Sequence, residues 1–211
     1  METKKVVLVI VDISGYTQFI RSEKMSAVHA EEIIFDLLEA VIDKAAYPLT
    51  LNKLEGDAAL LYAELKDDET AVARDVACQV QAFFDVFYER ARLLSSERAD
   101  CDCNACQRIL DLRLKAFLHH GEVVFKKIRQ FEEMAGEDII IVHRLTKNSI
   151  PSNEYILMTN AFHQLAGDLP NMDMETRQEN YEELGAVDIK VFHPKKKNET
   201  KLDLPIYEQF F

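Results

Sequence analysis

Six consecutive apolar residues at positions 6–11 are mostly β-branched, and the run stops at a carboxylate, Asp12. An unbroken apolar run of this length predicts a strand that is buried on both faces. The strand delivers the acid to a turn that contains Gly15, a residue that lets backbone approach a ligand closely. Either Asp12 or Ser14 caps a helix that begins near Tyr16, or Asp12 helps to hold a cation, and the pattern alone leaves both interpretations open.

The rest of the chain alternates between helical and strand-like spacing of its apolar residues. Two long amphipathic helices are predicted, one over residues 26–46 and one that opens at the acidic cluster of residues 67–69. Between them, two β-like segments, residues 49–54 and 58–63, flank Gly56 and Asp57 and predict a hairpin. The other expected elements are helices at 16–21, 139–148 and 160–166, strands at 110–118, 155–158, 187–192 and 205–210, and a loop at 167–180.

Asp57 at the hairpin tip is a second acid at a strand end. Two carboxylates in such positions can share one metal site, and the alternative for Asp57 is ordinary turn chemistry. The segments Asp12-Ile13-Ser14-Gly15-Tyr16-Thr17 and Lys53-Leu54-Glu55-Gly56-Asp57 together resemble the catalytic domain of class III adenylate and guanylate cyclases. That family has Asp-Ile-x-Gly-Phe-Thr after an apolar strand and then Lys-x-x-Gly-Asp, so Tyr16 replaces a Phe.

The resemblance, which covers roughly residues 5 to 195, implies a fold and a metal site. The fold would be α/β (α+β), a ferredoxin-like class III cyclase fold whose central, mainly antiparallel sheet has flanking helices. Asp12, Ile13 and Asp57 would form the site for Mg²⁺ or Mn²⁺. The family works as dimers, so we expect a homodimer in which one protomer supplies the metal acids and the other the base-reading pair and an arginine.

The same resemblance indicates a substrate. Lys53 stands at the family's adenine-reading lysine position, and Glu133 stands where the family has an Asp. A lysine that donates to the acceptor N1 of adenine and an acid that accepts from its donor N6 would favour ATP over GTP. The alternative is that Lys53 and Glu133 are ordinary surface charges. Arg144 matches an arginine that would stabilise charge developing on the α-phosphate.

Two positions depart from the family. Ile140 replaces the Asn that orients the ribose, and Asn148, one helical turn beyond Arg144, would substitute only for a substrate that lay further along the helix. The triphosphate-binding Lys-Gly-Lys is absent, which leaves Lys190 or residues 195–197 as replacements.

Two functions therefore stay open. The leading one is metal-dependent binding of ATP, extended to its conversion to cyclic AMP and pyrophosphate. The alternative is a catalytically inactive, dimeric cyclase-like module that senses nucleotides or binds proteins.

Residues 119–124 also resemble the family, which has Ile-His-Thr-Gly-x-Val at a hairpin there. Gly121 is then explained by a turn, His119 is expected to be structural, and His120 replaces a Thr.

Three cysteines, Cys101, Cys103 and Cys106, lie in an insertion at about residues 95–108 that the family does not require. Thiolates at this spacing in a reducing compartment suit a structural, tetrahedral zinc site, and the alternative is three reduced thiols in a loop. A fourth ligand is absent locally. Candidates are Cys78, His119, His120 or the partner protomer, and we expect the metal to fix this crossover without touching the nucleotide site.

Composition narrows these possibilities further. A chain of 211 residues with 48% hydrophobic content is expected to form one domain over residues 1–211. No stretch approaches the roughly 20 apolar residues that span a bilayer, and the beginning of the chain lacks the pattern of a signal peptide, so we expect a cytoplasmic protein. The net charge of −12 argues against a nucleic-acid partner.

Overall fold

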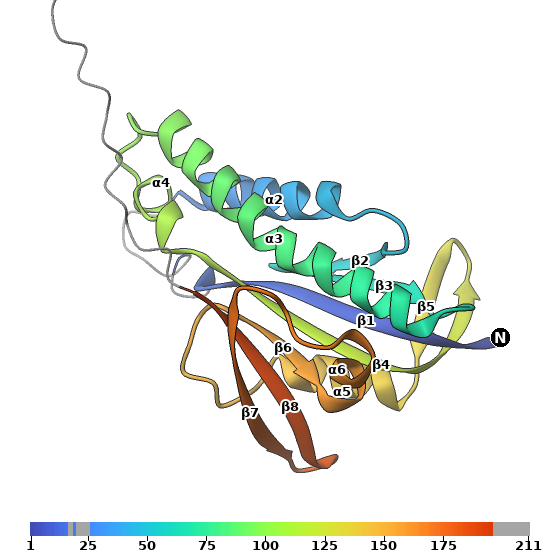
Figure 1. The fold of residues 1–211 in the computed structure, drawn as a ribbon. Coiled ribbons are helices and arrows are strands. Elements are labelled where there is room, and N and C mark those ends of the chain that lie inside the picture. The colour runs from blue at the N-terminus through green and yellow to red at the C-terminus, as the bar shows by residue number, and fades with distance from the viewer. Residues whose placement is uncertain (17–18, 20–25, 196–211) are drawn as a thin grey trace, which may run out of the picture.

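The sheet is built around β1 (Glu2–Ser14), the strand that contains the apolar run (Figure 1). The computed structural model of the chain describes residues 1–16, 19 and 26–195. The strands follow one another across the sheet in the order β2-β3-β1-β4-β6-β8-β7, and β5 pairs with β4. The other strands are β2 (Thr50–Glu55), β3 (Ala58–Glu64), β4 (Arg113–Ile128), β5 (Phe131–Ala135), β6 (Tyr155–Thr159), β7 (Met172–Tyr181) and β8 (Gly185–Pro194).

Helices cover both faces of this sheet. They are α2 (Ala27–Lys44), α3 (Glu69–Glu97), α4 (Asn104–Gln107), α5 (Glu137–Leu145) and α6 (Asn160–Ala166), with a 3-10 turn, η1 (Ile109–Asp111). Among the strand pairs of the described residues, β4 and β6 run parallel and the others antiparallel. The predicted mainly antiparallel sheet with flanking helices is confirmed.

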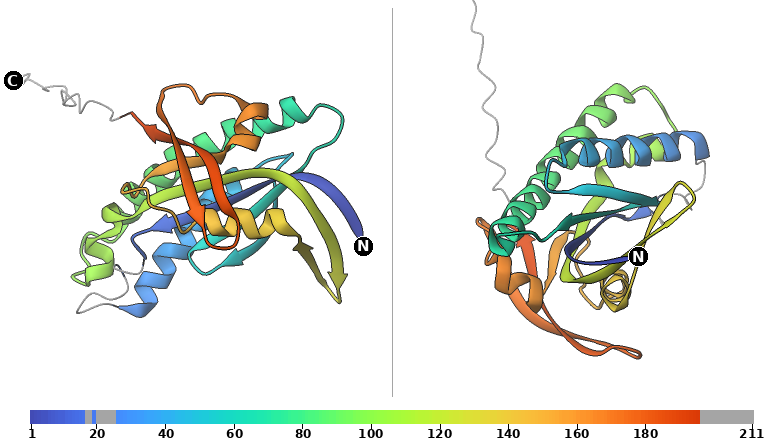
Figure 2. Two further views of the ribbon diagram at one scale, coloured as in Figure 1. Left: turned by 90° about the horizontal axis from the view of Figure 1, so that it is seen from below. Right: turned by 90° about the vertical axis from the view of Figure 1, so that its right-hand side faces the viewer.

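Alternation along β1 divides the core into two layers. Val7 and Val9 belong to the cluster beneath α2, α3 and α6, whereas Val6 and Leu8 belong to the cluster beneath α5. Figure 2 shows α2 and α3 together on one side of the sheet and α5 on the other. Because side chains alternate between faces, Asp12 lies on the same face as Val6 and Leu8.

The two long helices begin where the sequence predicts. The Ser26 side chain caps α2 by accepting from the backbone N–H of His29 at 3.3 Å, and Asp68 caps α3 by accepting from Ala71 at 3.0 Å. Arg90 of α3 and Arg98 at its C-cap then pair with acids of α2: Arg90 contacts Asp36 through two nitrogens at 2.6 Å each, and Arg98 contacts Glu32 at 3.0 Å. These pairs hold the two helices side by side.

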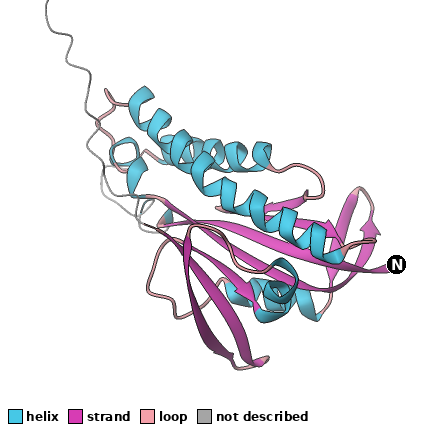
Figure 3. Ribbon diagram, viewed as in Figure 1, coloured by secondary structure: helices cyan, strands magenta, loops and turns pink. Residues whose placement is uncertain are grey.

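Two strands were not predicted from the sequence. β7 occupies most of the expected loop at 167–180, and β5 precedes α5. Both are largely exposed, and β7 and β8 extend from the sheet as a two-stranded arm (Figure 3). Exposed edge strands lack the alternation of apolar residues that identifies a strand, and they are held by backbone pairing to β4 and β8.

Other boundaries also differ from the predicted ones. The strand expected at 110–118 begins only at Arg113, because residues 109–111 form η1. β4 continues through Gly121 to Ile128, so no turn lies at Gly121, and α5 ends at Leu145, so Asn148 lies beyond the helix. The predicted strand at 205–210 and most of the predicted helix at 16–21 lie outside the described residues. In the described part of the chain, every helix is too short or too polar to cross a bilayer.

Candidate functional site

The carboxyl end of β1 and the β2–β3 turn form one pocket. Its volume is about 330 Å³, and its lining consists of Asp12, Ile13, Ser14, Gly15, Tyr16, Asp57, Lys115 and Asn153. The backbone N–H of Ile13 donates to the carbonyl oxygen of Asp57 at 3.0 Å, which joins the two acidic segments directly. Gly15 and Gly56 have φ values of 97° and 68°, a conformation that favours glycine in both turns. The structure therefore brings together the three residues predicted to hold metal.

Burial and neighbouring negative charge raise the pKa values of both acids in this pocket. Burial and the nearby charge of Asp57 raise the pKa of Asp12 to about 6, although Lys115 opposes the shift. Burial also raises the pKa of Asp57, with a further contribution from Glu31. Such a pair of partly buried carboxylates is stabilised by a hard cation, and its oxygens are the ligands that Mg²⁺ and Mn²⁺ prefer, so the donor set fits the expected metal.

Lys115 is a member of the pocket that the sequence analysis missed. It lies opposite Asp12 in the β1–β4 register, and its Nζ lies 5.4 Å from the centre of the Tyr155 ring. Burial lowers its pKa, while Asp12 opposes that change. In the sequence it occupies a polar position of an alternating strand, which is typical of a solvent-facing side chain; only the strand register places it beside the acids.

Lys53 and Glu133 lie in a second pocket of about 220 Å³ between β2 and β5. The Lys53 Nζ lies 3.9 Å from Glu133 Oε2 and 3.3 Å from Glu55 Oε1. The structure thus places the predicted donor and acceptor side by side, on a half-exposed surface. This pocket shares no lining residue with the one that contains Asp12 and Asp57.

The predicted phosphate-binding arginine lies on a third part of the surface. Arg144, in the last turn of α5, donates to Glu183 in the β7–β8 turn at 2.7 Å. Ile140, one turn earlier on α5, is 49% exposed. Neither residue lines the carboxylate pocket.

Asn148 and Lys190 are engaged in local structure. The Asn148 amide bonds to the Tyr155 hydroxyl at 2.8 Å and accepts from the backbone N–H of Ile150 at 3.0 Å. Lys190 donates to Thr176 at 2.8 Å, and its neighbours Ile189 and Val191 lie in the core layer beneath α5. Lys190 therefore points to the opposite face from Asp12. Of residues 195–197, only Lys195 is among those the structure describes.

His119 is buried in a hydrogen-bonded network. Its Nδ1 lies 2.9 Å from Thr159 Oγ1 and its Nε2 2.8 Å from Asp138 Oδ1. Burial lowers its pKa, whereas Asp138 opposes that shift. The second Asp138 oxygen accepts from the backbone of Glu122, and a Cβ at Gly121 would overlap this carboxylate. Gly121 is thus explained by close approach of Asp138 and not by the expected turn.

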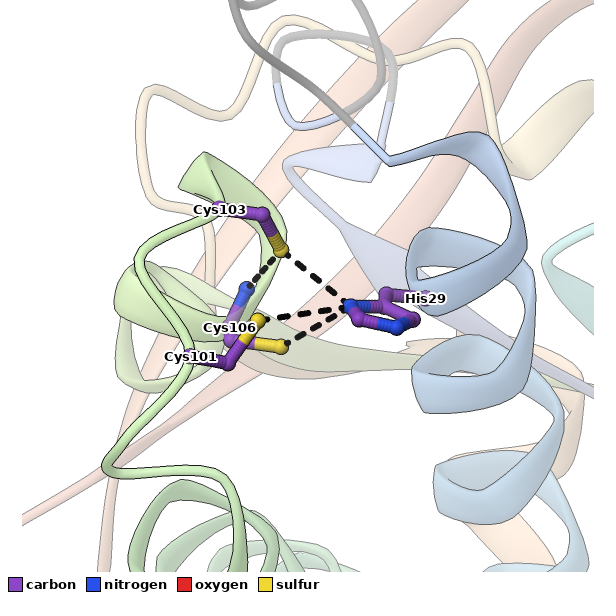
Figure 4. Close-up of side chains that lie close together, drawn as sticks. All are labelled: His29, Cys101, Cys103 and Cys106. Atoms are coloured by element: carbon purple, nitrogen blue, oxygen red, sulfur yellow. Dashed lines mark hydrogen bonds between the residues drawn. The ribbon is translucent and has the colours of Figure 1, made fainter.

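The cysteine cluster has its fourth donor on a distant helix. His29 of α2 lies with Cys101, Cys103 and Cys106, and the four candidate ligand atoms all fall within 4.8 Å of one another (Figure 4). The candidates expected for this role lie elsewhere: Cys78 is exposed on α3, and His119 is bonded to Thr159 and Asp138. His120 is also outside the group. Sequence spacing could not find His29, because it lies more than 70 positions from the cysteines.

Replacing Asp12 with asparagine is expected to stabilise the metal-free protein at neutral pH. An acid whose pKa is higher in the folded than in the unfolded state loses stability as pH rises from the unfolded pKa through the folded one, here from about 4 to about 6. The gain for Asp12→Asn at pH 7.5 is expected to be roughly 1–3 kcal/mol, and it should shrink below pH 5. Urea unfolding with a chelator present measures it.

The exposed carboxylate of Asp43 on α2 provides the matched control, since Asp43→Asn should change the free energy of unfolding by less than about 0.5 kcal/mol at either pH. An Asp12→Asn protein that is no more stable than the parent at pH 7.5 would show that the ionised Asp12 carboxylate does not destabilise the folded state.

Comparison with known proteins gives a family and a fold. A family model described as "Protein of unknown function (DUF2652)" matches residues 34–155. The uncharacterized protein Rv2561/Rv2562 of Mycobacterium tuberculosis is 38% identical over 128 residues, which make up 61% of this chain and 58% of that protein. This chain therefore spans a little over half the length of that relative.

Among solved structures, similarity extends over almost the whole chain. The adenylyl cyclase CyaB from P. aeruginosa matches with a TM-score of 0.67 and 16% identity, over 93% of this chain and 97% of that one. The guanylate cyclase domain of RhGC from Catenaria anguillulae, solved in complex with GTP, has a TM-score of 0.64 and 13% identity, over 93% of this chain and 100% of that one. The expected cyclase fold is confirmed.

Proposed function

We propose that this chain, which belongs to the DUF2652 family of proteins of unknown function, is a divergent class III nucleotidyl cyclase-like domain that binds ATP with divalent metal. The observation that carries the proposal is the pocket in which Asp12, Asp57 and Lys115 converge at the strand ends. Conversion of ATP to cyclic AMP and pyrophosphate is its catalytic extension.

The carboxylate pocket suits a metal-bound triphosphate. The side chains of Asp12 and Asp57, with the backbone at Ile13, would hold Mg²⁺ or Mn²⁺. When bound, the metal would lower the pKa of the ribose 3′-hydroxyl and neutralise phosphate charge. Lys115 would contact a phosphate oxygen from the same wall of the pocket, which supplies a cation where the chain lacks the Lys-Gly-Lys of cyclases.

Cyclisation of ATP would require few chemical contributions from the protein. The 3′-oxygen would attack the α-phosphorus, a new O–P bond would form, and the bond to the pyrophosphate oxygen would break while the hydroxyl proton passes to solvent. The protein must position these groups and stabilise the charge that develops on the α-phosphate. Arg144 is suited to the second task once it exchanges its contact with Glu183 for the phosphate.

A homodimer would bring the separated groups together. Three groups lie apart on the surface of one chain: the base-reading pair Lys53 and Glu133, the arginine Arg144, and the acidic pair of the carboxylate pocket. A two-fold related copy could present its base-reading pair and arginine to the acids of the first chain, which gives two equivalent composite sites. Exposed apolar side chains near the base-reading pair, Leu51, Leu54 and Phe131, suit burial against such a copy.

A second candidate function is a catalytically inactive nucleotide sensor or protein-interaction module with the same fold. Two observations favour it: the ribose-orienting position holds Ile140, and Arg144 is already paired with Glu183. Such a module would retain ATP binding or dimerisation without turnover.

The proposal is tested by nucleotide preference. The parent is expected to bind 3′-deoxy-ATP, which lacks the attacking hydroxyl, about tenfold or more tighter than 3′-deoxy-GTP in the presence of Mn²⁺. Lys53→Glu should remove most of this preference, because it places an acceptor opposite the adenine N1 acceptor. Calorimetric titration with both nucleotides measures the ratio.

Lys44→Glu, at an exposed lysine in the last turn of α2, makes the same charge change away from the pocket and should leave the ratio unaltered. If the parent binds neither nucleotide, the function is wrong, and if it binds both equally, the base-reading assignment of Lys53 and Glu133 fails.

A further inference from the structure

We propose that His29, Cys101, Cys103 and Cys106 bind one zinc ion, and that this ion fastens the amino end of α2 to the crossover between α3 and β4. The proposal concerns a different part of the molecule from the carboxylate pocket and does not depend on nucleotide binding. It rests on the geometry of the four donors, on the local backbone and on the charges around them.

The donor separations match a tetrahedral zinc site. His29 Nδ1 lies 3.4 Å from the sulfur of Cys103, 3.5 Å from that of Cys101 and 3.6 Å from that of Cys106 (Figure 4). Zinc–sulfur bonds of about 2.3 Å and zinc–nitrogen bonds of about 2.0–2.1 Å at tetrahedral angles separate nitrogen from sulfur by about 3.5–3.6 Å. The imidazole nitrogen therefore lies from each of the three sulfurs at about the nitrogen–sulfur distance that a shared metal would impose.

The backbone around the cysteines is arranged as a metal-binding turn. Cys103 and Cys106 form a Cys-x-x-Cys pair in which the Cys103 sulfur accepts from the backbone N–H of Cys106 at 3.5 Å. The side chain of Gln107 donates to the carbonyl oxygen of Cys101 at 2.9 Å and closes the loop. Backbone N–H donors stabilise thiolates, the form in which cysteine binds metal.

Charge and burial favour zinc over other occupants. Three thiolates and a neutral imidazole around Zn²⁺ leave one net negative charge, and Arg98 interacts with Cys106 while it also pairs with Glu32 of α2. Cys106 is 4% exposed, and His29, Cys101 and Cys103 are partly buried, so the cluster is largely shielded from solvent. Soft sulfur ligands in a closed set of four suit structural zinc and not Mg²⁺ or Ca²⁺.

The helix that supplies His29 also borders the carboxylate pocket. Glu31, two residues further along α2, accepts from the hydroxyl of Tyr16 at 2.7 Å, and Tyr16 lines the pocket. A zinc ion on His29 would therefore hold the end of α2 that positions this contact. The expectation that a metal in the cysteine loop would not touch the nucleotide site stays a prediction, since the four donors and the lining of the carboxylate pocket share no residue.

Metal content tests the site. Protein produced with zinc, purified without a polyhistidine tag and kept reduced is expected to contain about one zinc per chain by elemental analysis. Cys103→Ser and His29→Ala should lower the content to a small fraction, whereas Cys78→Ser, which removes the exposed cysteine of α3, should retain it. His29→Cys should also retain zinc, because four thiolates form an equally good site.

Cobalt(II) gives a readout that distinguishes ligands. The parent loaded with Co²⁺ is expected to show the intense visible bands of tetrahedral cobalt with thiolate charge transfer, and His29→Cys should shift those bands to longer wavelength. A parent without zinc and without these bands overturns the proposal, as does a Cys103→Ser variant that binds Co²⁺ as the parent does.

Melting temperature separates a structural metal from an incidental one. A strong chelator should lower the melting temperature of the parent by several degrees and should leave that of Cys103→Ser unchanged. Zinc that can be removed without any change in the melting temperature would contradict the fastening role, even if the four ligands were correct.

Discussion

Asp57→Asn is expected to abolish saturable Mn²⁺ binding measured in the presence of 3′-deoxy-ATP. The carboxylate is half of the acidic pair in the pocket, and burial together with the charge of Asp57 raises the pKa of its partner Asp12 to about 6, although Lys115 opposes the shift. Loss of an outer-shell partner of a metal site costs 10–100-fold in affinity, so loss of a direct carboxylate ligand should cost at least about 100-fold. Manganese titration followed by electron paramagnetic resonance measures free ion directly.

Lys115→Met distinguishes a phosphate contact from a merely structural cation in the same pocket. Without nucleotide, removal of the positive charge should leave Mn²⁺ binding intact or tighter, because Lys115 no longer opposes a cation beside Asp12. With 3′-deoxy-ATP, affinity for the nucleotide should fall. If both affinities fall together, Lys115 is needed for the shape of the pocket and not for phosphate.

Mixing two variants that each weaken ATP binding, one at the metal acid and one at the base-reading lysine, tests whether sites are shared between protomers. In a homodimer of the proposed kind, Asp57→Asn and Lys53→Glu chains form a mixed dimer with one intact composite site. Equal mixtures should recover about a quarter of the parent's ATP sites at the parent's affinity. Recovery of none, with exchange of subunits demonstrated, would place each site within one chain.

The strand that ends at Asp12, the hairpin tip at Asp57 and the two long helices could be predicted from the sequence, because each depends on a local pattern of residues. An apolar run that ends at Asp12 is enough to predict a buried strand and its terminal acid, and Gly56-Asp57 between two strand-like segments is enough to predict a hairpin tip. Both are set by residues within a few positions of one another. Helices α2 and α3 were predictable for the same reason, since their caps and apolar stripes are local.

Contacts between segments that are distant in the sequence could not be predicted from local patterns. Lys115 and His29 carry no local signal: the first reaches its pocket through the β1–β4 register, and the second reaches the cysteines because two arginine–acid pairs hold α2 against α3. β7 was missed for a related reason. Its pairing with β8 supplies the stability that its own side chains, most of them exposed, do not.

Ile140→Asn is expected to raise cyclic AMP formation by about 100-fold over the parent. Ile140 lies four residues before Arg144, on the same face of α5. By the sequence resemblance it takes the place of the asparagine that orients the ribose in class III cyclases. A positioning contact of this kind is worth about two orders of magnitude in turnover, because the attacking oxygen must lie in line with the leaving group. At 49% exposure, the isoleucine contributes little to the core, so the change should not unfold the protein. Chromatographic detection of cyclic AMP and pyrophosphate measures the gain.

Leu93→Asn is the matched control, since Leu93 on α3 is 50% exposed and lies outside every proposed contact. It should leave turnover at the parent level. The gain from Ile140→Asn should also vanish when Asp12→Asn is added, because the proposed metal-binding acid would be required for the same step. If Ile140→Asn binds ATP as the parent does and forms no more cyclic AMP, the orienting position is not what limits turnover. The Arg144–Glu183 pair then becomes the stronger explanation, and the inactive nucleotide-sensing module becomes the better account of this chain.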